Sequence, residues 1–170
     1  MIELGKQQDI EEILNSINEA KKEMENDHNP QWSEDDYPNF KIPSDIEKEN
    51  LYVYKEDNHI QGFIVIEKDK GEYERLVKTS KEPSYILHRL TIPKKYRHLG
   101  IAKKLIRFAE ELATKNKIKV VKGDTEVSNT KMNNLFKKLG YIEKGTFIYE
   151  DYPGKYIYYE KEVGSDTHEI

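Results

Sequence analysis

The sequence has no cysteine among its 170 residues, only one tryptophan, and six prolines. Without cysteine the chain can form no disulfide, no thiolate nucleophile and no cysteine-ligated zinc site. No apolar run is long enough to cross a bilayer, and the first ten residues lack the basic and apolar regions of a signal peptide. We therefore expect a cytoplasmic protein with no membrane partner.

The charges are nearly balanced, with 28 Lys and Arg against 32 Asp and Glu, for a net charge of -4. A general nucleic-acid binder is usually basic, so we expect no nucleic-acid partner. The histidines stand at positions 28, 59, 88, 98 and 168, which is not a metal-ligand spacing, and we expect no metal. Hydrophobic residues make up 36% of the chain. We predict a single domain over residues 1–163, followed by a polar tail over residues 164–170.

The stretch from Tyr85 to Asn116 organises the rest of the chain. A β-rich run, Tyr85 to Ile92, ends at Pro93 and is followed by a short basic loop. Apolar residues then recur at the spacing of one helical face: Ile101, Leu105, Ile106, Ala109, Leu112 and Ala113. At a helix start the first N–H groups have no intrahelical partner and the macrodipole is positive. Gly100, which has no Cβ, would let the backbone approach a phosphate, so we predict an anion site here.

The remaining pattern alternates strands and helices. Asp9 is predicted to cap a first helix, and Ser44 with Glu47 to form the capping box of a second. Asp57–Asn58 predicts a hairpin turn, and Gly140 a left-handed helix end. The predicted strands are Ile2–Leu4, Leu51–Lys55, Ile60–Glu67, Tyr85–Ile92, Ile118–Thr125, Thr146–Glu150 and Tyr156–Val163, and a helix capped by Ser128 or Asn129 precedes the last two.

Two segments resemble a known family. The pattern R-x-x-G-x-A, carried by Arg97, Gly100 and Ala102, resembles the acetyl-CoA pyrophosphate signature of the GNAT superfamily of N-acetyltransferases. The segment N-T-K-M-N-N-L-F-K-K-L-G-Y, from Asn129 to Tyr141, is similar to the second conserved segment of that family. Two shorter segments, I-L-H-R-L-T-I around His88 and D-T-x-x-x-N from Asp124 to Asn129, look like those of one bacterial subgroup of small GNAT proteins. The resemblance implies an α/β fold of mixed α+β type: a twisted, mostly antiparallel sheet with a splayed parallel pair and helices on both faces.

The resemblance also implies acetyl-CoA as cosubstrate and direct transfer of its acetyl group to a primary amine, on a small molecule or a peptide N-terminus. The pyrophosphate would lie on main-chain N–H groups, and the pantetheine arm on the edge of the central strand. The residues implied for the cofactor are Leu90, Thr91, Ile92, Arg97, His98, Leu99, Gly100, Ile101, Ala102, Lys103, Asn129 and Phe136. Asn129 could equally be a plain helix cap.

An alkylammonium has a pKa of about 10, so the acceptor must lose a proton before it attacks. The family often places a glutamate on the central strand, and Ile86 stands at that position here. His88 and Glu126 are the candidate bases, although His88 could be a partly buried structural residue. The family's thiolate-protonating tyrosine corresponds to Phe136, which has no proton to give; Tyr141 and Tyr149 are possible substitutes.

Two other functions stay open. An acyl-CoA-sensing module with little turnover would explain Phe136, and a nucleic-acid binder would use the basic cluster around Arg97. Loops 26–40 and 69–83 are expected to determine the specificity for the acceptor amine. The acidic trio Glu34–Asp35–Asp36 is either a solvated loop or a lid for an ammonium group. Either a monomer or a homodimer is compatible with the aromatic-rich final strand.

Overall fold

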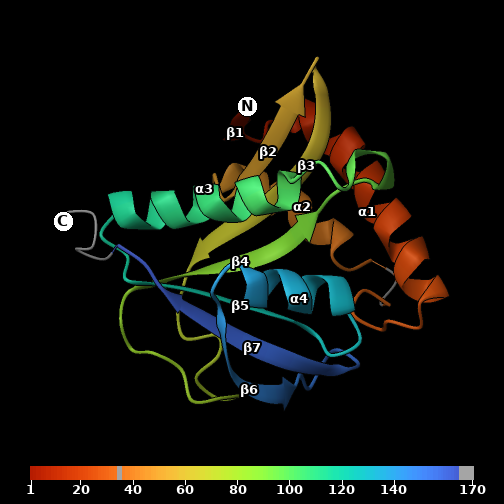
Figure 1. Ribbon diagram of the computed structural model, residues 1–170. Helices are drawn as coiled ribbons and strands as arrows, with labels where there is room; N and C mark the ends of the chain where they lie inside the picture. The colour runs from red at the N-terminus through yellow and green to blue at the C-terminus, as the bar shows by residue number, and fades with distance from the viewer. Residues whose placement is uncertain (34–35, 165–170) are drawn as a thin grey trace. The chain divides into compact units, whose positions relative to one another are not determined.

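The computed structural model describes residues 1–33 and 36–164. The chain forms two compact units, which we treat separately. The first unit contains residues 1–66 and 88–106, and the second contains residues 67–87 and the chain from Arg107 onward. Strand β3 (His59–Lys68), strand β4 (Ser84–Thr91) and helix α3 (Ile101–Lys115), labelled in Figure 1, each contribute residues to both units. The strand order is β1-β2-β3-β4-β5-β7-β6, with one parallel pair, so the predicted mixed α/β fold is confirmed.

The first unit is built on the hairpin of β2 (Leu51–Glu56) and β3 (His59–Lys68), with β1 (Ile2–Leu4) antiparallel to β2. Asp57 and Asn58 both have positive φ, 52° and 64°, as a two-residue hairpin turn of type I′ requires. Helix α1 (Ile10–Asn26) buries Ile13 and Ile17 in the core of this unit. The hairpin and the turn were both predicted from the sequence, and both are confirmed.

The sequence predicted the N-terminal residues of two helices of the first unit, and one of these predictions is wrong. Asp9 is the N-cap residue of α1, but its carboxylate accepts from the Lys6 N–H and pairs with the Lys55 ammonium at 2.9 Å. Helix α2 (Ile42–Glu47) begins before Ser44, so the predicted capping box of Ser44 and Glu47 is wrong. Pro43 explains the earlier start, because its fixed φ suits the first turn of a helix.

The second unit contains the parallel pair. The first residues of β4 (Ser84–Thr91) lie parallel to β5 (Val120–Glu126), with the registered pairs running from Ser84–Val120 to Ile86–Lys122. Strand β7 (Lys155–Glu162) is antiparallel to β5 and to β6 (Ile142–Ile148), which begins earlier than the predicted Thr146. Helix α4 (Thr130–Lys138) has Asn129 as its N-cap and ends before Gly140, whose φ is +91°. Both predicted ends of this helix are confirmed.

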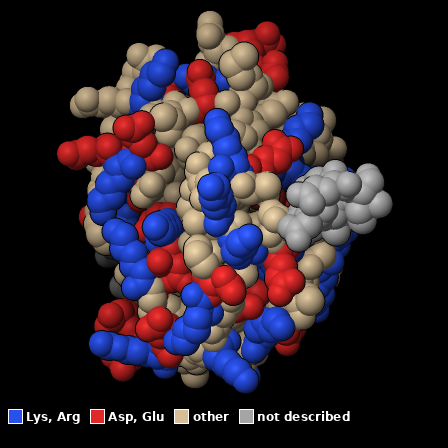
Figure 2. All heavy atoms as spheres, turned by 90° about the vertical axis from the view of Figure 1, so that its left-hand side faces the viewer, with Lys and Arg blue, Asp and Glu red and all other residues tan. Residues whose placement is uncertain are grey.

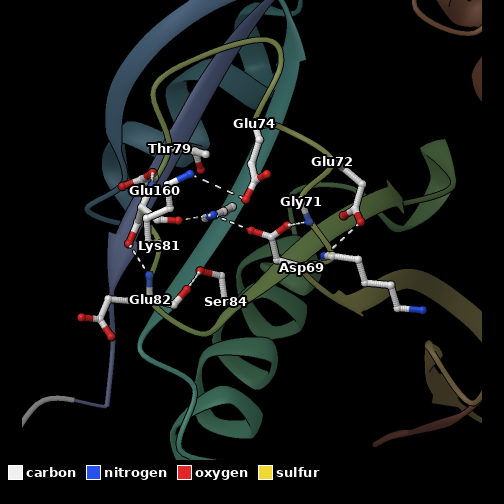
Figure 3. Close-up of polar contacts among 12 residues, drawn as sticks. Asp69, Gly71, Glu72, Glu74, Thr79, Lys81, Glu82, Ser84 and Glu160 are labelled. Atoms are coloured by element: carbon white, nitrogen blue, oxygen red, sulfur yellow. Dashed lines mark hydrogen bonds and ion pairs between the residues drawn. The ribbon is translucent and has the colours of Figure 1, made fainter.

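Loop 69–83 is fixed to the second unit by a buried lysine. Lys122 of β5 is 0% exposed, and its Nζ donates to Asp69 Oδ2 at 2.5 Å and to the Ser80 carbonyl at 2.8 Å. Glu160 of β7 accepts from the Ser80 N–H at 2.8 Å (Figure 3). Tyr73, in the middle of the loop, is 1% exposed. The loop is therefore packed onto β5 and β7.

Helix α3 (Ile101–Lys115) carries the apolar face predicted from its spacing, with Ile101, Leu105, Ile106, Ala109 and Ala113 all buried. In the described ranges, no helix has both the length and the apolar character needed to span a membrane. Glu34 and Asp35 of the acidic trio, and the tail beyond Gly164, lie outside the described residues.

Candidate functional site

Strand β4 is kinked just before the predicted site. Arg89 has a φ of +53°, a left-handed conformation that a residue with a side chain seldom adopts inside a strand. Its guanidinium binds both carboxylate oxygens of Asp45 on α2, with Nε–Oδ2 and Nη2–Oδ1 distances of 2.9 Å. Both side chains are buried. This charge-assisted, two-point contact stabilises the kink.

The loop after β4 is held by Arg97, which follows a 3-10 turn at Lys94–Tyr96. Arg97 Nε donates to the Ile92 carbonyl at 3.0 Å, and Nη1 donates to Glu23 Oε2 of α1 at 2.5 Å. Its guanidinium therefore ties the loop to the end of β4 and to α1. The signature arginine of the sequence pattern is placed as a positioning residue, and Glu23 is a partner that the pattern did not reveal.

The turn from Arg97 into α3 exposes its backbone. His98 and Gly100 both have left-handed φ values, 66° and 78°. Lys104 N–H donates to the Gly100 carbonyl at 3.1 Å, the first bond of the helix. The N–H groups of Ile101, Ala102 and Lys103 therefore precede the intrahelical ladder. A Cβ added at Gly100 would meet no atom within 4 Å, so open space lies beside this backbone.

These features suit a phosphate-rich group. The main-chain donors lie at the positive end of the α3 dipole, next to the open space at Gly100, and His98 and Lys103 are exposed at the same turn. Leu99 is 59% exposed, which is unusual for a leucine and leaves an apolar surface at the same turn. The turn from Arg97 to Lys103 could therefore hold an anion chemically, and the anion site stays a prediction.

The strand residues predicted for the cofactor lie on the same side of the kink. Leu90 and Ile92 are half-buried, whereas Thr91 is buried and its hydroxyl donates to the Arg89 carbonyl at 2.9 Å. The side chain of Thr91 thus stabilises the kink, so only its main-chain groups are suited to a ligand.

The two predicted cofactor residues of the second unit have clear local roles. Asn129 Oδ1 accepts from the Met132 N–H at 3.1 Å, the bond of an N-cap, so Nδ2 is the group that a ligand could use. Phe136 is 2% exposed, stacks on Tyr159 with a centroid distance of 4.7 Å, and packs edge-on against Tyr141. Its contact with a cofactor stays a prediction.

The two predicted bases differ in their surroundings. His88 is half-buried, and burial, with the nearby cations Arg89 and Lys41, lowers its pKa to about 3. Its imidazole is therefore neutral at pH 7, but it is too weakly basic to hold a proton taken from an ammonium group. Glu126 is 5% exposed, and its Oε2 accepts from both the N–H and the hydroxyl of Ser128.

The predicted substitutes for the missing tyrosine are also engaged. Tyr141 donates to Glu110 Oε2 at 2.7 Å, and burial together with that carboxylate raises the pKa of its phenol far above its usual value. Tyr149 donates to Asp124 Oδ2 at 2.9 Å. Tyr141 is therefore a poor proton donor toward a departing thiolate.

Comparison with known proteins identifies the family of this chain. The model of the acetyltransferase (GNAT) family matches residues 10–141, more than half of the chain. The chain belongs to the GNAT acetyltransferase family. It is therefore an acetyl-CoA-dependent acyltransferase, as the sequence resemblance implied.

Three relatives illustrate the match. The uncharacterized N-acetyltransferase YesJ of Bacillus subtilis strain 168 is 22% identical over 130 residues, which cover 74% of this chain and 68% of that protein. A solved structure from Staphylococcus aureus Mu50 is 30% identical and has a TM-score of 0.73, with 95% of this chain and 98% of that chain covered. A GNAT-family acetyltransferase from Streptococcus agalactiae 2603 has a TM-score of 0.84 at 23% identity, with 97% and 96% covered.

The surface charges of this acetyltransferase are mixed. On the face shown in Figure 2, Lys and Arg side chains are interspersed with Asp and Glu. In the basic loop, Lys95 lies over the Tyr96 ring at 5.1 Å, and Arg97 is paired with Glu23. Over residues 1–33 and 36–164, no group of three or more acidic or histidine side chains could hold a metal ion.

Proposed function

We propose that this protein transfers the acetyl group of acetyl-CoA to a primary amine, on a small molecule or a peptide N-terminus, by direct attack of the amine on the thioester. The observation that carries the proposal is the open turn from Arg97 to Lys103, where the N–H groups that precede the first helical bond lie at the positive end of α3. Such a turn binds the diphosphate of the cosubstrate without base recognition.

The proposed cofactor contacts divide by chemistry. The N–H groups from Leu99 to Lys103 bind the pyrophosphate, with Lys103 adding positive potential and the His98 ring available as a hydrogen-bond donor. Main-chain groups of Leu90 and Ile92 pair with the amides of the pantetheine arm, in the manner of an added strand. Arg97 holds the turn through Glu23 and the Ile92 carbonyl. Asn129 Nδ2 and the ring edge of Phe136 are proposed to border the arm.

The acceptor must reach the thioester as a neutral amine, because an ammonium group has no free electron pair. The nitrogen then bonds to the carbonyl carbon, the carbon–sulfur bond breaks, and the sulfur leaves with its electron pair. A main-chain N–H on β4 is proposed to stabilise the charge that develops on the carbonyl oxygen. His88 and Glu126 are candidate bases, to be separated by His88→Gln and Glu126→Gln.

A thiol-release assay with acetyl-CoA and a panel of primary amines tests the proposal. We expect thiol release that depends on the amine, and micromolar to millimolar binding of coenzyme A by calorimetry. Failure of coenzyme A to bind would contradict the proposed anion site, and acceptor-independent release alone would contradict amine transfer.

A second function, an acyl-CoA sensor with little turnover, is favoured by one observation. The position of the family tyrosine holds a buried phenylalanine, and the nearby Tyr141 hydroxyl is bound to Glu110. Tight binding of coenzyme A without thiol release for any amine in the panel would support this function instead.

A further inference from the structure

Asp124, a residue to which the proposed cofactor site gives no role, lies on the face of β5 away from α4. Its neighbour Gly123 faces α4, since a Cβ added there would lie 2.8 Å from Cζ of Phe136. Successive side chains of a strand point to opposite faces, so Asp124 points away from α4. The last registered pair between β4 and β5 is Ile86–Lys122, and Asp124 comes two residues after Lys122. Asp124 is therefore on the part of β5 that extends past its ladder with β4.

One oxygen of Asp124 is held by two phenols. Oδ2 accepts from the Tyr73 hydroxyl at 2.5 Å and from the Tyr149 hydroxyl at 2.9 Å. Tyr73 comes from loop 69–83 and Tyr149 follows β6, so residues 51 and 25 positions away meet at one atom. This arrangement fixes the carboxylate in a single orientation.

The other oxygen, Oδ1, is available. Within residues 1–33 and 36–164 no hydrogen bond is made to it, yet no buried side-chain oxygen or nitrogen there lacks a partner. Oδ1 must therefore reach solvent, in agreement with the half-buried state of Asp124. A fixed carboxylate with one bound and one accessible oxygen is arranged to accept a hydrogen bond from a ligand.

The surrounding charges leave this carboxylate without a cation. Tyr158 of β7 lies directly opposite Asp124, and Lys122 and Glu126 share its strand face. The Lys122 ammonium is bound to Asp69 and the Ser80 carbonyl. Burial raises the pKa of Asp124, and the hydrogen bonds from the two tyrosines oppose that rise. Among the described residues the carboxylate thus makes no ion pair, and it is more basic than an ordinary aspartate.

We propose that Asp124 is the acceptor-binding base: its Oδ1 binds the ammonium group of the amine and takes one proton from it. This inference rests on the proposed function. The N–H bond to that proton breaks as the O–H bond forms, and the neutral nitrogen then attacks the thioester carbon. After the carbon–sulfur bond breaks, the nitrogen gives up its second proton, which the thiolate takes. The half-buried rings of Tyr149 and Tyr152 pack edge-on 5.9 Å apart in the same unit, and their faces suit an alkylammonium.

Asp124 suits this role better than either base predicted from the sequence. His88 has a pKa of about 3, so it would release the proton at once. Glu126 is 5% exposed and already accepts two hydrogen bonds from Ser128 on Oε2, so its carboxylate is engaged within the protein. Asp124 combines a raised pKa with an accessible oxygen.

The first test compares Asp124→Asn with Glu110→Gln, which changes a second buried carboxylate that accepts from a tyrosine. Because proton transfer contributes 10²- to 10⁴-fold, we expect Asp124→Asn to lower kcat/KM for amines at least about 100-fold. Coenzyme A affinity should stay within about twofold in both variants, and Glu110→Gln should keep its kcat/KM. Near-wild-type kcat/KM in Asp124→Asn, beside an active wild type, would overturn the proposal.

Amine binding separates this proposal from the proposed function. Titration of the protein–coenzyme A complex with linear alkylamines should show binding by the wild type and a loss of at least tenfold in Asp124→Asn. Equal binding in both proteins would overturn the proposal, whatever the turnover. Absence of turnover in the wild type with Asp124-dependent amine binding would instead contradict the proposed function alone.

A pH profile gives a readout that does not depend on whether Asp124→Asn folds. Tyr73→Phe removes one hydrogen bond that lowers the pKa of Asp124. The acidic limb of kcat/KM should therefore move upward by about half a pH unit to one pH unit. An unmoved limb in Tyr73→Phe would overturn the proposal.

Discussion

The two units of this acetyltransferase share ion pairs but differ in a second kind of polar contact. The first unit pairs opposite charges: Arg89 with Asp45, Lys55 with Asp9, and Arg97 with Glu23. The second unit has the buried pair of Lys122 with Asp69, and in addition it repeatedly sets a tyrosine hydroxyl against a carboxylate, as in the contacts Tyr73–Asp124, Tyr141–Glu110 and Tyr158–Glu160.

The difference matters for chemistry. An ion pair keeps both partners charged over a wide pH range, so it fixes backbone geometry, as at the β4 kink and the turn before α3. A phenol holds a carboxylate in place without cancelling its charge, so the carboxylate can still bind a cation or exchange a proton. The ion pairs of the first unit are therefore suited to fixing backbone geometry, and the phenol-bound carboxylates of the second unit to keeping their charge.

The largest expected effect comes from breaking an ion pair of the first unit. Asp45→Ala removes both oxygens that bind Arg89 and leaves a buried guanidinium with less compensation. We expect the free energy of unfolding to fall by about 3 kcal/mol. Urea denaturation followed by circular dichroism would measure it, and a loss below about 1 kcal/mol would show that the pair does not stabilise the kink.

The pH dependence of stability gives the next test. The pKa of His88 is about 3 in the folded protein, against an ordinary value of 6.5. The unfolded chain therefore binds a proton that the folded chain rejects, so stability is retained above pH 6.5 and lost as the pH falls toward 3. We expect a loss of at most about 1.4 kcal/mol per pH unit from this group. His88→Gln should flatten the curve between pH 6 and 4; an unchanged slope would contradict the low pKa.

The third prediction concerns the turn that begins α3. Gly100→Ala places a side chain at a φ of +78°, which costs about 1 kcal/mol or more, although nothing lies within 4 Å of the new Cβ. The turn should shift, and coenzyme A binding should weaken several-fold by calorimetry. Gly154→Ala, at a φ of +103° in the β6–β7 turn, is the matched control, with similar strain and unchanged affinity.

The smallest effect is expected for a phenol–carboxylate contact of the second unit. Tyr141→Phe removes one hydrogen bond to Glu110, which keeps Arg107 and Lys161 as partners. We expect a loss of about 1 kcal/mol in the free energy of unfolding. If this loss equalled that of Asp45→Ala, the contrast between the two units would not hold.

The elements set by short-range chemistry could be predicted from the sequence. Asp57–Asn58 gave the hairpin because both residues tolerate positive φ, and Gly140 gave the end of α4 for the same reason. Asn129 was foreseen as a helix cap. The prediction of Ser44 as the N-cap of a capping box was wrong. Pro43 favours the first helical turn, so the helix already begins before Ser44.

The parts of the candidate site that escaped prediction depend on contacts between distant residues. Asp45 and Arg89 are 44 positions apart, and Tyr73 and Asp124 are 51 apart, so no local pattern connects them. The sequence shows the motif that begins at Asp124, but the role of Asp124 can be inferred only from its contacts with Tyr73 and Tyr149. The basicity of His88 likewise depends on burial and on Lys41, neither of which the sequence displays.

The buried Lys122 has a consequence for engineering the specificity of this enzyme. Because its ammonium is bound to Asp69 and to the Ser80 carbonyl, loop 69–83 is attached to β5 by a residue outside the loop itself. A relative without a lysine at position 122 has no need of an acidic residue at position 69. A chimera that imports residues 69–83 from such a relative would leave the buried Lys122 ammonium with no carboxylate to neutralise it. Segment and strand must be exchanged together, and libraries that vary only the segment should begin by keeping Asp69.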